Sequence, residues 1–378
     1  MPTGKIKVRF RDRKDHLVIT LYKDLRVKFG IKLNSIILFE VNHHNFIRIP
    51  NKDFHITIPK KLIKNKCNLI TIKILRVYNK EDCIIRDKEY INTKGMNFKA
   101  IIPKKTKSNK DLFVLDFYDY LYVWYSIGGG AEPVLIKKNI DLISISELAG
   151  FFFGDGNTSE GIKSFRLNNC EPSTLNHSLN ILQKIGISRK VWKVQIIYST
   201  NKDLTDVIKE RCIDYWSKTL KFKKNQIVSV NKNKAKTESL EYGSARIFFD
   251  NNTFIEIMLN GVLKKFINIV QSPKNKYEKQ ILVGFIRGLA AAEACPILTK
   301  LGALSKVAFS FNPHNDSLNF YKEMLKNIGV NYAGAHGNEL YIYGIKNFKI
   351  FNQINLFKFH KSRKEKFDFG YKNHKFSN

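Results

Sequence analysis

The chain has 378 residues, of which 43% are apolar, so it is long enough for two or three domains with real cores and is not a disordered chain. Lys and Arg outnumber Asp and Glu by 65 to 33, and the formal charge of +32 favours a polyanionic partner, nucleic acid first, although a Lys-rich proteome would explain part of the excess. The five cysteines include no CxxC pair, and no apolar run approaches the roughly 20 residues of a membrane span. A zinc ribbon, a disulfide framework and a membrane protein are therefore disfavoured, and a reducing, cytoplasmic location is expected.

Residues 1–126 are predicted to form a mostly β accessory domain. Short runs of Ile, Val, Phe and Tyr are separated by charged and Asn-rich turns, as expected of strands. The strands are predicted at Leu17–Tyr22, Ile36–Val41, Phe46–Ile49, Leu69–Val77 and Phe113–Phe117. The basic composition of this domain is compatible with DNA binding. Three consecutive glycines, Gly128-Gly129-Gly130, then favour a linker over residues 127–140, because glycine has the most backbone freedom and no side chain to pack.

Residues 141–271 and 272–357 are predicted to be two similar halves, followed by a basic tail at 358–378. The first half is expected to begin with a helix over Asp141–Gly156, with Ser144 and Glu147 as a capping box. Its other helices are predicted at Ser173–Ile185, Asp203–Leu220 and Thr253–Ile269, and its strands at Phe165–Asn168, Lys190–Thr200, Ile227–Val230 and Ala245–Asp250. The second half is predicted as helix Tyr277–Glu293, strand Val307–Phe311, helix Asp316–Ile328, strand Glu339–Tyr343 and helix Ile345–Leu356. The shared order indicates an internal repeat of roughly 100 residues.

The helix that opens each half carries small residues four positions apart and ends in an acid. Residues four apart share one face of a helix, and small ones let two helix backbones approach closer than the usual interaxial distance of about 8–10 Å. The small residues are Gly150 and Gly154 in the first helix and Gly288 and Ala292 in the second, and the acids are Asp155 and Glu293. We therefore expect the two helices to pack through these faces. A chance cluster of small residues would explain one such helix more easily than two.

Packing of the two faces would bring the carboxylates of Asp155 and Glu293 side by side. Two adjacent carboxylates repel each other and raise a pKa unless a cation lies between them. Mg²⁺ suits such a site, because it takes few protein carboxylates and leaves room for water and phosphate oxygens. The pair is therefore predicted to hold Mg²⁺ for phosphodiester hydrolysis. Either acid alone would be simply a solvated carboxylate at a helix end.

The two segments resemble the paired motifs of the single-chain LAGLIDADG homing endonucleases. LAGFFFGDG at 148–156 is similar to the first motif, and GFIRGLAAAEA at 284–294 is similar to the FIRGLxxAEG form of archaeal members. The resemblance covers residues 141–357. It implies an α+β fold of two pseudo-symmetric αββαββα halves packed through the motif helices. It also implies a monomeric, site-specific double-strand DNA endonuclease with a long asymmetric target, as in intron homing, and with Asp155 and Glu293 as catalytic Mg²⁺ ligands helped by the carbonyls of Gly156 and Ala294.

The sequence departs from the family pattern after the second acid. Ala294 stands where the family has a final glycine, which is expected in a left-handed turn. Cys295 and Pro296 then occupy a stretch where some members carry a basic residue near the metals. Candidate replacements for that base are Lys163, Lys300 and Lys306, although each is more simply a surface lysine.

DNA contacts are predicted on the strands of both halves. A strand turns alternate side chains to one face, and Arg, Gln and Asn can read base edges in the major groove. The predicted contact residues are Arg166, Asn168, Lys193, Gln195, Lys306 and Ser310. Half-exposed strand polarity would explain any one of them equally well.

Two other functions remain open, and a third is disfavoured. A DNA-binding regulator that has kept this fold without cleavage would explain the departures at Ala294 and Pro296. An RNA-splicing maturase would use the same fold on intron RNA, so RNA remains a candidate partner. An intein is disfavoured, because the chain starts Met1-Pro2 and no His directly precedes the final Asn378. No HExxH or GxxxxGK[ST] motif supports a zinc enzyme or a P-loop NTPase.

Overall fold

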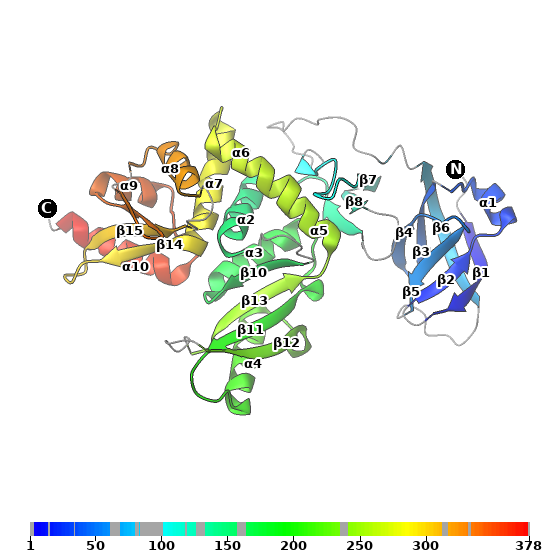
Figure 1. Ribbon diagram of the computed structural model, residues 1–378, viewed down its shortest axis with the longest axis horizontal. Coiled ribbons are helices and arrows are strands. Elements are labelled where there is room, and N and C mark those ends of the chain that lie inside the picture. The colour runs from blue at the N-terminus through cyan, green and yellow to red at the C-terminus, as the bar shows by residue number, and fades with distance from the viewer. Residues whose placement is uncertain are drawn as a thin grey trace. The chain divides into compact units, whose positions relative to one another are not determined.

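The computed structural model describes residues 4–13, 16–33, 35–60, 69–79, 83, 101–117, 119–125, 133–156, 164–234, 241–311, 317–331 and 334–376. Contacts within the chain divide it into two compact units (Figure 1). The first comprises Met1–Lys88 and Lys104–Val134, and the second Glu89–Pro103 and Leu135–Asn378. The division at Val134 falls inside the predicted linker, but residues 101–103, predicted in the accessory domain, group with the second unit. Within the described ranges, no helix combines the length and apolarity needed to cross a bilayer.

The first unit is built on a six-stranded antiparallel sheet with the order β4-β3-β6-β1-β2-β5. Its strands are β1 (Gly4–Asp12), β2 (His16–Thr20), β3 (Ser35–Val41), β4 (His44–Arg48), β5 (His55–Pro59) and β6 (Leu69–Asn79). Alternate residues point into a core that includes Val8, Phe39 and Ile72. The short helix α1 (Lys23–Phe29) ends at Gly30, whose φ of 65° is a left-handed conformation that glycine adopts without steric cost. The hairpin of β7 (Leu112–Phe117) and β8 (Tyr120–Tyr125) belongs to the same unit.

The first half of the second unit combines a four-stranded sheet with five helices within the described residues. Strand β9 (Val134–Lys137) leads into it, and its amide at Lys137 donates to the carbonyl of Ile185 at 2.9 Å. The strands of the sheet are β10 (Phe165–Asn169), β11 (Lys193–Ser199), β12 (Ile227–Asn233) and β13 (Ser244–Phe249), in the order β10-β13-β11-β12. The helices are α2 (Leu142–Asp155), α3 (Pro172–Lys184), α4 (Asp206–Leu220), α5 (Asn252–Glu256) and α6 (Lys264–Gln271), with single 3₁₀ turns at Arg189–Val191 and Lys224–Gln226.

The helix predicted at Thr253–Ile269 contains a π-helical stretch, Ile257–Leu263, between α5 and α6. Gly261 lies in this stretch, and a Cβ there would come within 2.3 Å of the carbonyl oxygen of Ile101. The wider helical turn and the missing side chain therefore admit the backbone of residues 101–103, which the sequence pattern had placed in the other domain.

The second half has the long helix α7 (Lys276–Glu293), a four-stranded sheet and three further helices in the part of the chain that the structure describes. Its strands are β14 (Ala294–Leu298), β15 (Leu304–Ser310), β16 (Gly334–His336) and β17 (Glu339–Ile342), in the order β14-β15-β17-β16. Its other helices are α8 (Ser317–Lys326), α9 (Ile345–Gln353) and α10 (Lys361–Phe376). The prediction of a basic tail at 358–378 was wrong for most of its length, because α10 buries Phe367 and Tyr371 and lies against β14 and β15.

The two halves are alike in their sheets but not identical. After α2, Gly156 forms an antiparallel bridge with Leu167 of β10, and after α7, Ala294 pairs in the same sense with Phe309 of β15. In the first half, α4 and the parallel strand β12 are added at the sheet edge beside β11. Among the described residues the first half also has a single strand, β10, between α2 and α3, so its element order differs from the αββαββα pattern predicted for both halves.

Candidate functional site

Helices α2 and α7 are in backbone contact along the predicted small-residue faces and lie side by side in Figure 1. A Cβ at Gly150 would lie 1.9 Å from the carbonyl oxygen of Phe285, and a Cβ at Gly288 would lie 1.9 Å from that of Glu147. Because the atoms met are backbone, no side-chain rotation could relieve either clash. The glycines at these two positions are what allow the helices to approach each other this closely.

The acids meet at the C-terminal ends of the two helices. A Cβ at Gly154 would lie 2.5 Å from the Cβ of Ala292 and 3.4 Å from Oε1 of Glu293. Glu293 therefore reaches over the last turn of α2, and Asp155 is the next residue along that turn. The structure thus brings together the two acids that the sequence pattern singled out.

Two consecutive phenylalanines fix the rotation of α2 and so the direction of Asp155. The ring of Phe152 stacks on Phe165 of β10 with centroids 4.5 Å apart, in the core of the first half. The ring of Phe153 lies 5.1 Å from that of Phe320 of α8, in the core of the second half. Neighbouring residues of one helix are therefore anchored in both halves, which leaves Asp155 at the junction.

Asn169, which the sequence pattern did not single out, holds Asp155 in place. Its Nδ2 donates to Oδ2 of Asp155 at 2.6 Å, and its Oδ1 accepts from the backbone amide of Glu171 at 2.7 Å, so the orientation of the amide is fixed. Burial raises the pKa of Asp155 to about 7, the Asn169 bond and the charge of Arg363 oppose this rise, and the charge of Glu293 adds to it. Without a further cation, Asp155 is thus partly protonated at neutral pH.

Arg363 of α10 is a cation whose charge lowers the pKa of both acids. Its Nη1 donates to the last carbonyls of α7, at Ala290 (3.1 Å), Ala291 (2.9 Å) and Ala292 (3.1 Å). A positive charge is favourable at a helix C-terminus, where carbonyls lack partners. Burial raises the pKa of Glu293, and the charge of Arg363 opposes that rise.

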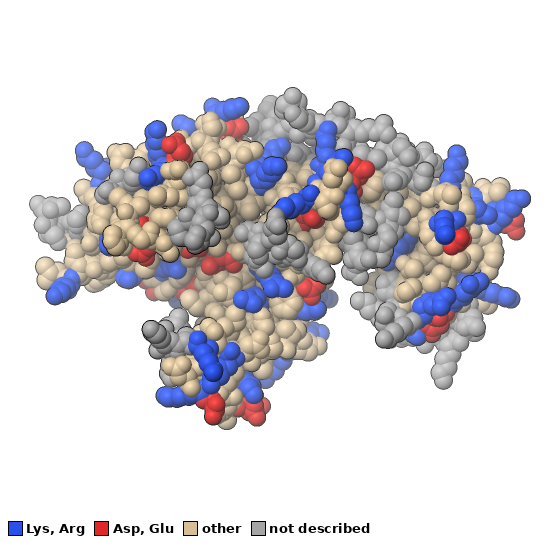
Figure 2. Space-filling model, viewed as in Figure 1, with Lys and Arg blue, Asp and Glu red and all other residues tan. Residues whose placement is uncertain are grey.

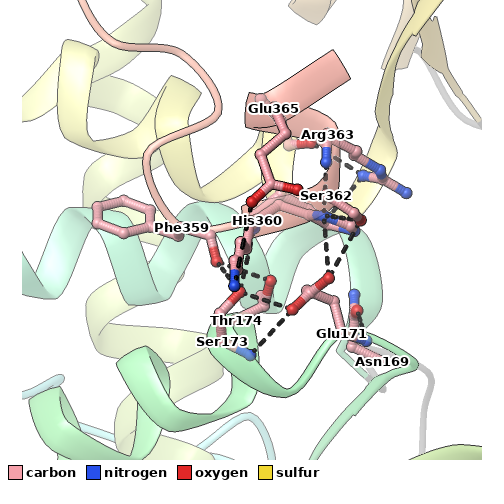
Figure 3. A network of polar contacts seen from close by, with 12 residues as sticks. Asn169, Glu171, Ser173, Thr174, Phe359, His360, Ser362, Arg363 and Glu365 are labelled. Carbon is pink, nitrogen blue, oxygen red and sulfur yellow. Dashed lines mark hydrogen bonds and ion pairs between the residues drawn. The ribbon is translucent and has the colours of Figure 1, made fainter. Parts of the chain in front are cut away.

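Residues around the start of α10 contact the start of α3 (Figure 3), and these contacts fix the position of Arg363. The hydroxyls of Ser173 and Thr174 donate to the carbonyl of Phe359 at 3.1 and 3.0 Å. The hydroxyl of Ser362 donates to Oε2 of Glu171, the N-cap residue of α3, at 3.1 Å. The C-terminal helix of the second half is in this way fastened to the first half beside the acid pair.

His360 lies inside this segment and makes the stability of the folded chain depend on pH. Its Nδ1 is 3.8 Å from Oε2 of Glu171, yet burial and the charge of Arg363 lower the pKa of His360 to about 4. The unfolded chain, with an ordinary histidine pKa of 6.5, takes up a proton between pH 6.5 and 4 that the folded chain does not.

We therefore expect stability to fall as pH drops through this window, by up to about 3 kcal/mol. Thermal melts from pH 7.5 to 4.5, compared with those of His360→Asn, would measure this. An equal pH dependence in the two proteins would contradict the prediction.

The predicted replacements for the missing base do not reach the acids among the described residues. Lys163 lies outside the described ranges. Lys300 is exposed in the turn after β14, and that five-residue strand carries it about 15–20 Å along the sheet from Glu293. The ammonium of Lys306 lies 3.6 Å from the ring centroid of Tyr341 on the outer face of its sheet. Arg363, in a segment predicted to be a tail, supplies the positive charge beside the acids that these lysines were expected to supply.

Two other expectations about the helix ends were wrong. The capping box of Ser144 and Glu147 is absent, because Asp141 caps α2 by accepting from the amides of Ile143 and Ser144. Glu147 instead bonds His177 at 3.1 Å in the buried interior.

The left-handed turn expected at Ala294 is also absent. Ala294 has a φ of −97° and Gly156 one of −86°, which are extended conformations open to any residue. Glycine is needed at 156 for another reason: a Cβ would lie 2.1 Å from the carbonyl oxygen of Phe152 and 2.2 Å from its ring.

The outer face of the first sheet carries a polar row across all four strands. Strand pairing aligns Asn168 of β10 with Arg246 of β13, Arg246 with Gln195 of β11, and Gln195 with Ser229 of β12. Nη1 of Arg246 donates to Oε1 of Gln195 at 3.2 Å. Arg246 was not predicted, although its alternation with the buried Ala245 could have revealed it.

The other predicted contact residues of this sheet lie in a parallel row. Arg166 pairs with Phe248, which pairs with Lys193. Nε of Arg166 donates to the hydroxyl of Ser164 at 2.7 Å, and Nζ of Lys193 is 2.9 Å from Asp250. The predicted residues of the first half therefore share one face.

The second sheet has a different outer face. Lys306 lies against Tyr341, whose hydroxyl donates to Glu339 at 2.6 Å, and Ser310 is the residue paired with Glu339. Two tyrosines and an acid stand there in place of the basic and amide side chains of the first sheet. The two halves would therefore contact a nucleic acid by different chemistry.

The acid pair fits a Mg²⁺ ion only with help from a ligand. No three His, Cys, Asp or Glu residues of the described chain are placed to hold a metal ion together. Mg²⁺ is commonly bound by one or two carboxylates with phosphate oxygens and water, so two acids suffice when a phosphate is present. Burial is the largest cause of the raised pKa of Asp155 and the charge of Glu293 adds to it, and a divalent cation bound to the pair would oppose both effects.

Comparisons with known proteins leave the family open. No protein-family model matches the sequence, and no curated protein matches it either. Among solved structures, the N-terminal LAGLIDADG domain of DUF199/WhiA is similar at a TM-score of 0.32 and 14% identity, over 57% of this chain and 82% of that one. Full-length DUF199/WhiA from Thermatoga maritima is similar at 0.33 and 15%, over 60% of this chain and 58% of that one. Likenesses of this size do not establish a shared fold, so the candidate site stands on its own geometry.

Proposed function

We propose that the second unit binds double-stranded DNA and hydrolyses its phosphodiester bonds at Asp155 and Glu293. The observation that carries the proposal is the backbone contact of α2 and α7, which places two carboxylates together at the helix ends. Such a pair costs stability through repulsion and burial, and costs of this kind are characteristic of functional sites.

The polar face of the first sheet is connected directly to the acid pair. Asn168 and Asn169 are consecutive residues of β10 and therefore point to opposite faces. Asn168 lies in the outer polar row, while Asn169 holds Asp155. The protein strand β10 would thus fix the position of a duplex bound on the outer face relative to the two acids. Arg, Gln and Asn are side chains that pair with G and A in the major groove.

Each residue has a separate task in the proposed reaction. Asp155 and Glu293 would hold Mg²⁺, with the carbonyls of Gly156 and Ala294 as the other proposed ligands. When bound, the ion would lower the pKa of a water and neutralise charge on the phosphodiester oxygens. Asn169 fixes the direction of the Asp155 carboxylate, and Arg363 supplies positive charge beside both acids.

A DNA-binding regulator without cleavage is the second candidate. Arg363 and Asn169 already give the two acids a cation and a hydrogen-bond donor, so the cluster can exist as an internal structural element. Incubation of the full chain with a random-sequence duplex library and Mg²⁺ separates the two. Cut ends recovered at a common sequence support the nuclease, whereas an enriched sequence without cut ends supports the regulator. A preference for structured RNA over every duplex would overturn both.

Arg246→Ala should weaken binding to the preferred duplex by roughly ten- to a hundredfold while changing random-sequence binding little. A bidentate side-chain contact to a base contributes about 1–3 kcal/mol of discrimination. Fluorescence anisotropy with both duplexes measures the change, and Lys218→Ala, at an exposed position of α4, is the control that removes the same charge. Equal losses in the two variants would show that Arg246 contributes only charge.

A further inference from the structure

One strand of the first unit carries an uninterrupted stripe of positive charge. In β1, Ile6 and Val8 point into the core, while Lys5, Lys7, Arg9 and Arg11 are exposed. The four cations alternate with the core residues, so all of them lie on the same face of the sheet. On the surface in view, Lys and Arg cover more of this unit than Asp and Glu do (Figure 2).

The stripe lacks acidic partners in the part of the chain that the structure describes. None of its four side chains makes a hydrogen bond or an ion pair there. Asp12, the acid at the end of the strand, forms an ion pair with Lys60 at 2.8 Å. On the neighbouring strand β6, the residue opposite Lys5 is another cation, Lys73, which pairs on its other side with Glu40 of β3. Like charges directly opposite each other on neighbouring strands are destabilising, so the arrangement has a cost in the isolated protein.

Two ordinary explanations do not account for the whole stripe. Lysines often protect the edge of a sheet from pairing with other chains. Within the described ranges, residues 4–9 of β1 pair with β6 alone and residues 10–12 with β2 alone, and the stripe continues beyond the stretch whose β2 side is open as far as Arg11, which pairs with Val18 of β2. A merely solvated face would intersperse both signs of charge, whereas the four exposed residues Lys5, Lys7, Arg9 and Arg11 of β1 repeat a single sign. Insertion into a membrane surface needs an apolar face beside the cations. The residues paired with Lys7 and Arg9 are Thr71 and Leu69, and one leucine is too little for that.

We infer that the exposed face of β1 binds the phosphate backbone of nucleic acid without reading its sequence. Alternate residues of a strand are about 7 Å apart, so the stripe runs for about 20 Å from Lys5 to Arg11. Over that length one strand of a duplex presents about six phosphates. The inference goes beyond the proposed function, because the stripe lies in the other unit and needs neither the acid pair nor the polar row of the second unit.

The salt dependence of binding tests the inference. The full chain is titrated with random-sequence duplex DNA at several salt concentrations, and the slope of log K against log[salt] is measured. Each phosphate contact contributes about 0.9 to this slope. The variant Lys5→Gln/Lys7→Gln/Arg9→Gln/Arg11→Gln should therefore lose about 3 to 4 from the slope and bind at least about tenfold more weakly at low salt.

The matched control removes four charges elsewhere. It changes the exposed residues Lys218, Lys326, Lys346 and Lys349 to Gln, all in helices of the second unit. A slope change below about 1 in this control, with the large change in the stripe variant, supports the inference. Equal changes in the two variants would show attraction by net charge alone and would overturn it.

Three other outcomes would also overturn the inference. They are an unchanged slope in the stripe variant, no duplex binding by the wild type, and loss of binding to phosphatidylserine vesicles with duplex binding intact. Failure of the proposed function is seen separately, since Arg246→Ala tests preference for one sequence, whereas the stripe variant should weaken all duplexes alike. Thermal melts of each variant show that the fold is retained.

Discussion

Gly288→Ala should destabilise the second unit by about 3 kcal/mol and lower its Tm by roughly 10 °C. The added methyl would lie 1.9 Å from the carbonyl oxygen of Glu147 and 2.7 Å from the backbone nitrogen of Phe151, so α2 and α7 would have to move apart. Alanine favours a helix over glycine by about 1 kcal/mol, which offsets only part of that cost. Differential scanning calorimetry of the full chain measures the shift.

Two other glycines make the prediction specific. Gly284→Ala should cost less, because its methyl would first meet Oγ of Ser146, at 2.2 Å, and a serine side chain can rotate. Gly334→Ala should change Tm by no more than about 1–2 °C, since nothing lies within 4 Å of its added Cβ. If Gly288→Ala melted like Gly334→Ala, the helices would not be in contact through this face.

The parts of this fold that sequence could predict are those set by local pattern. The face formed by Gly150, Gly154, Gly288 and Ala292 follows from helical periodicity, so the meeting of Asp155 and Glu293 could be expected from spacing alone. Helices α2 and α7 lie within two residues of their predicted ends, because glycine and the acids interrupt the apolar pattern there. The first strand after α7 was missed, because Pro296 argues against a strand, yet β14 has a single neighbour, β15, and a proline is tolerated at such an edge.

The partners of the acids could not be predicted, because they come from tertiary packing. Arg363 is 208 positions after Asp155, and no local pattern connects the two residues. The tail prediction followed from the density of lysines after residue 357, which hides the apolar residues that fasten α10 to its sheet. Asn169 could have been predicted from the sequence, because it continues the buried face of Phe165 and Leu167, and a polar residue on such a face needs a hydrogen-bond partner.

At the acid pair, a stabilising contact between two helices is combined with a destabilising pair of like charges. Close packing of glycine faces fixes the distance between two helix ends, and that packing holds Asp155 and Glu293 together against their repulsion. Arg363 opposes the rise in the pKa of both carboxyls and Asn169 opposes that of Asp155, but burial keeps both pKa values above the ordinary value. The helix interface in this way keeps an unfavourable charge pair in place.

Asp155→Asn and Glu293→Gln should each lower Mg²⁺-dependent cleavage by about 100-fold or more while leaving the affinity for duplex DNA within about threefold. Each change keeps the shape of the side chain and removes one ligand charge. Asn at 155 can still accept the bond from Nδ2 of Asn169, so the local structure should be kept. Single-turnover cleavage and anisotropy on the same duplex separate the two effects.

The stability of Asp155→Asn distinguishes a functional pair from a structural one. The pKa of Asp155 is about 7 in the folded chain against 3.8 for an ordinary aspartate, so the folded chain keeps a proton that the unfolded chain releases. The stability from this proton is complete below pH 3.8 and is lost as pH rises through about 7, by up to about 4 kcal/mol. In EDTA at pH 8 the variant should therefore melt above the wild type, and its Tm should depend less on pH.

A nearby acid with the opposite role serves as the control. Glu147 is also on α2, but it is buried in contact with His177 at 3.1 Å and Arg287 at 3.6 Å. Glu147→Gln should lower the Tm, because it leaves the half-buried Arg287 without its counter-charge, while the cleavage rate per folded molecule stays unchanged. Asp155→Asn should do the reverse in both measurements. If it too lowered the Tm in EDTA at pH 8, the carboxylate would be stabilising the fold and the case for a metal site at this pair would fail.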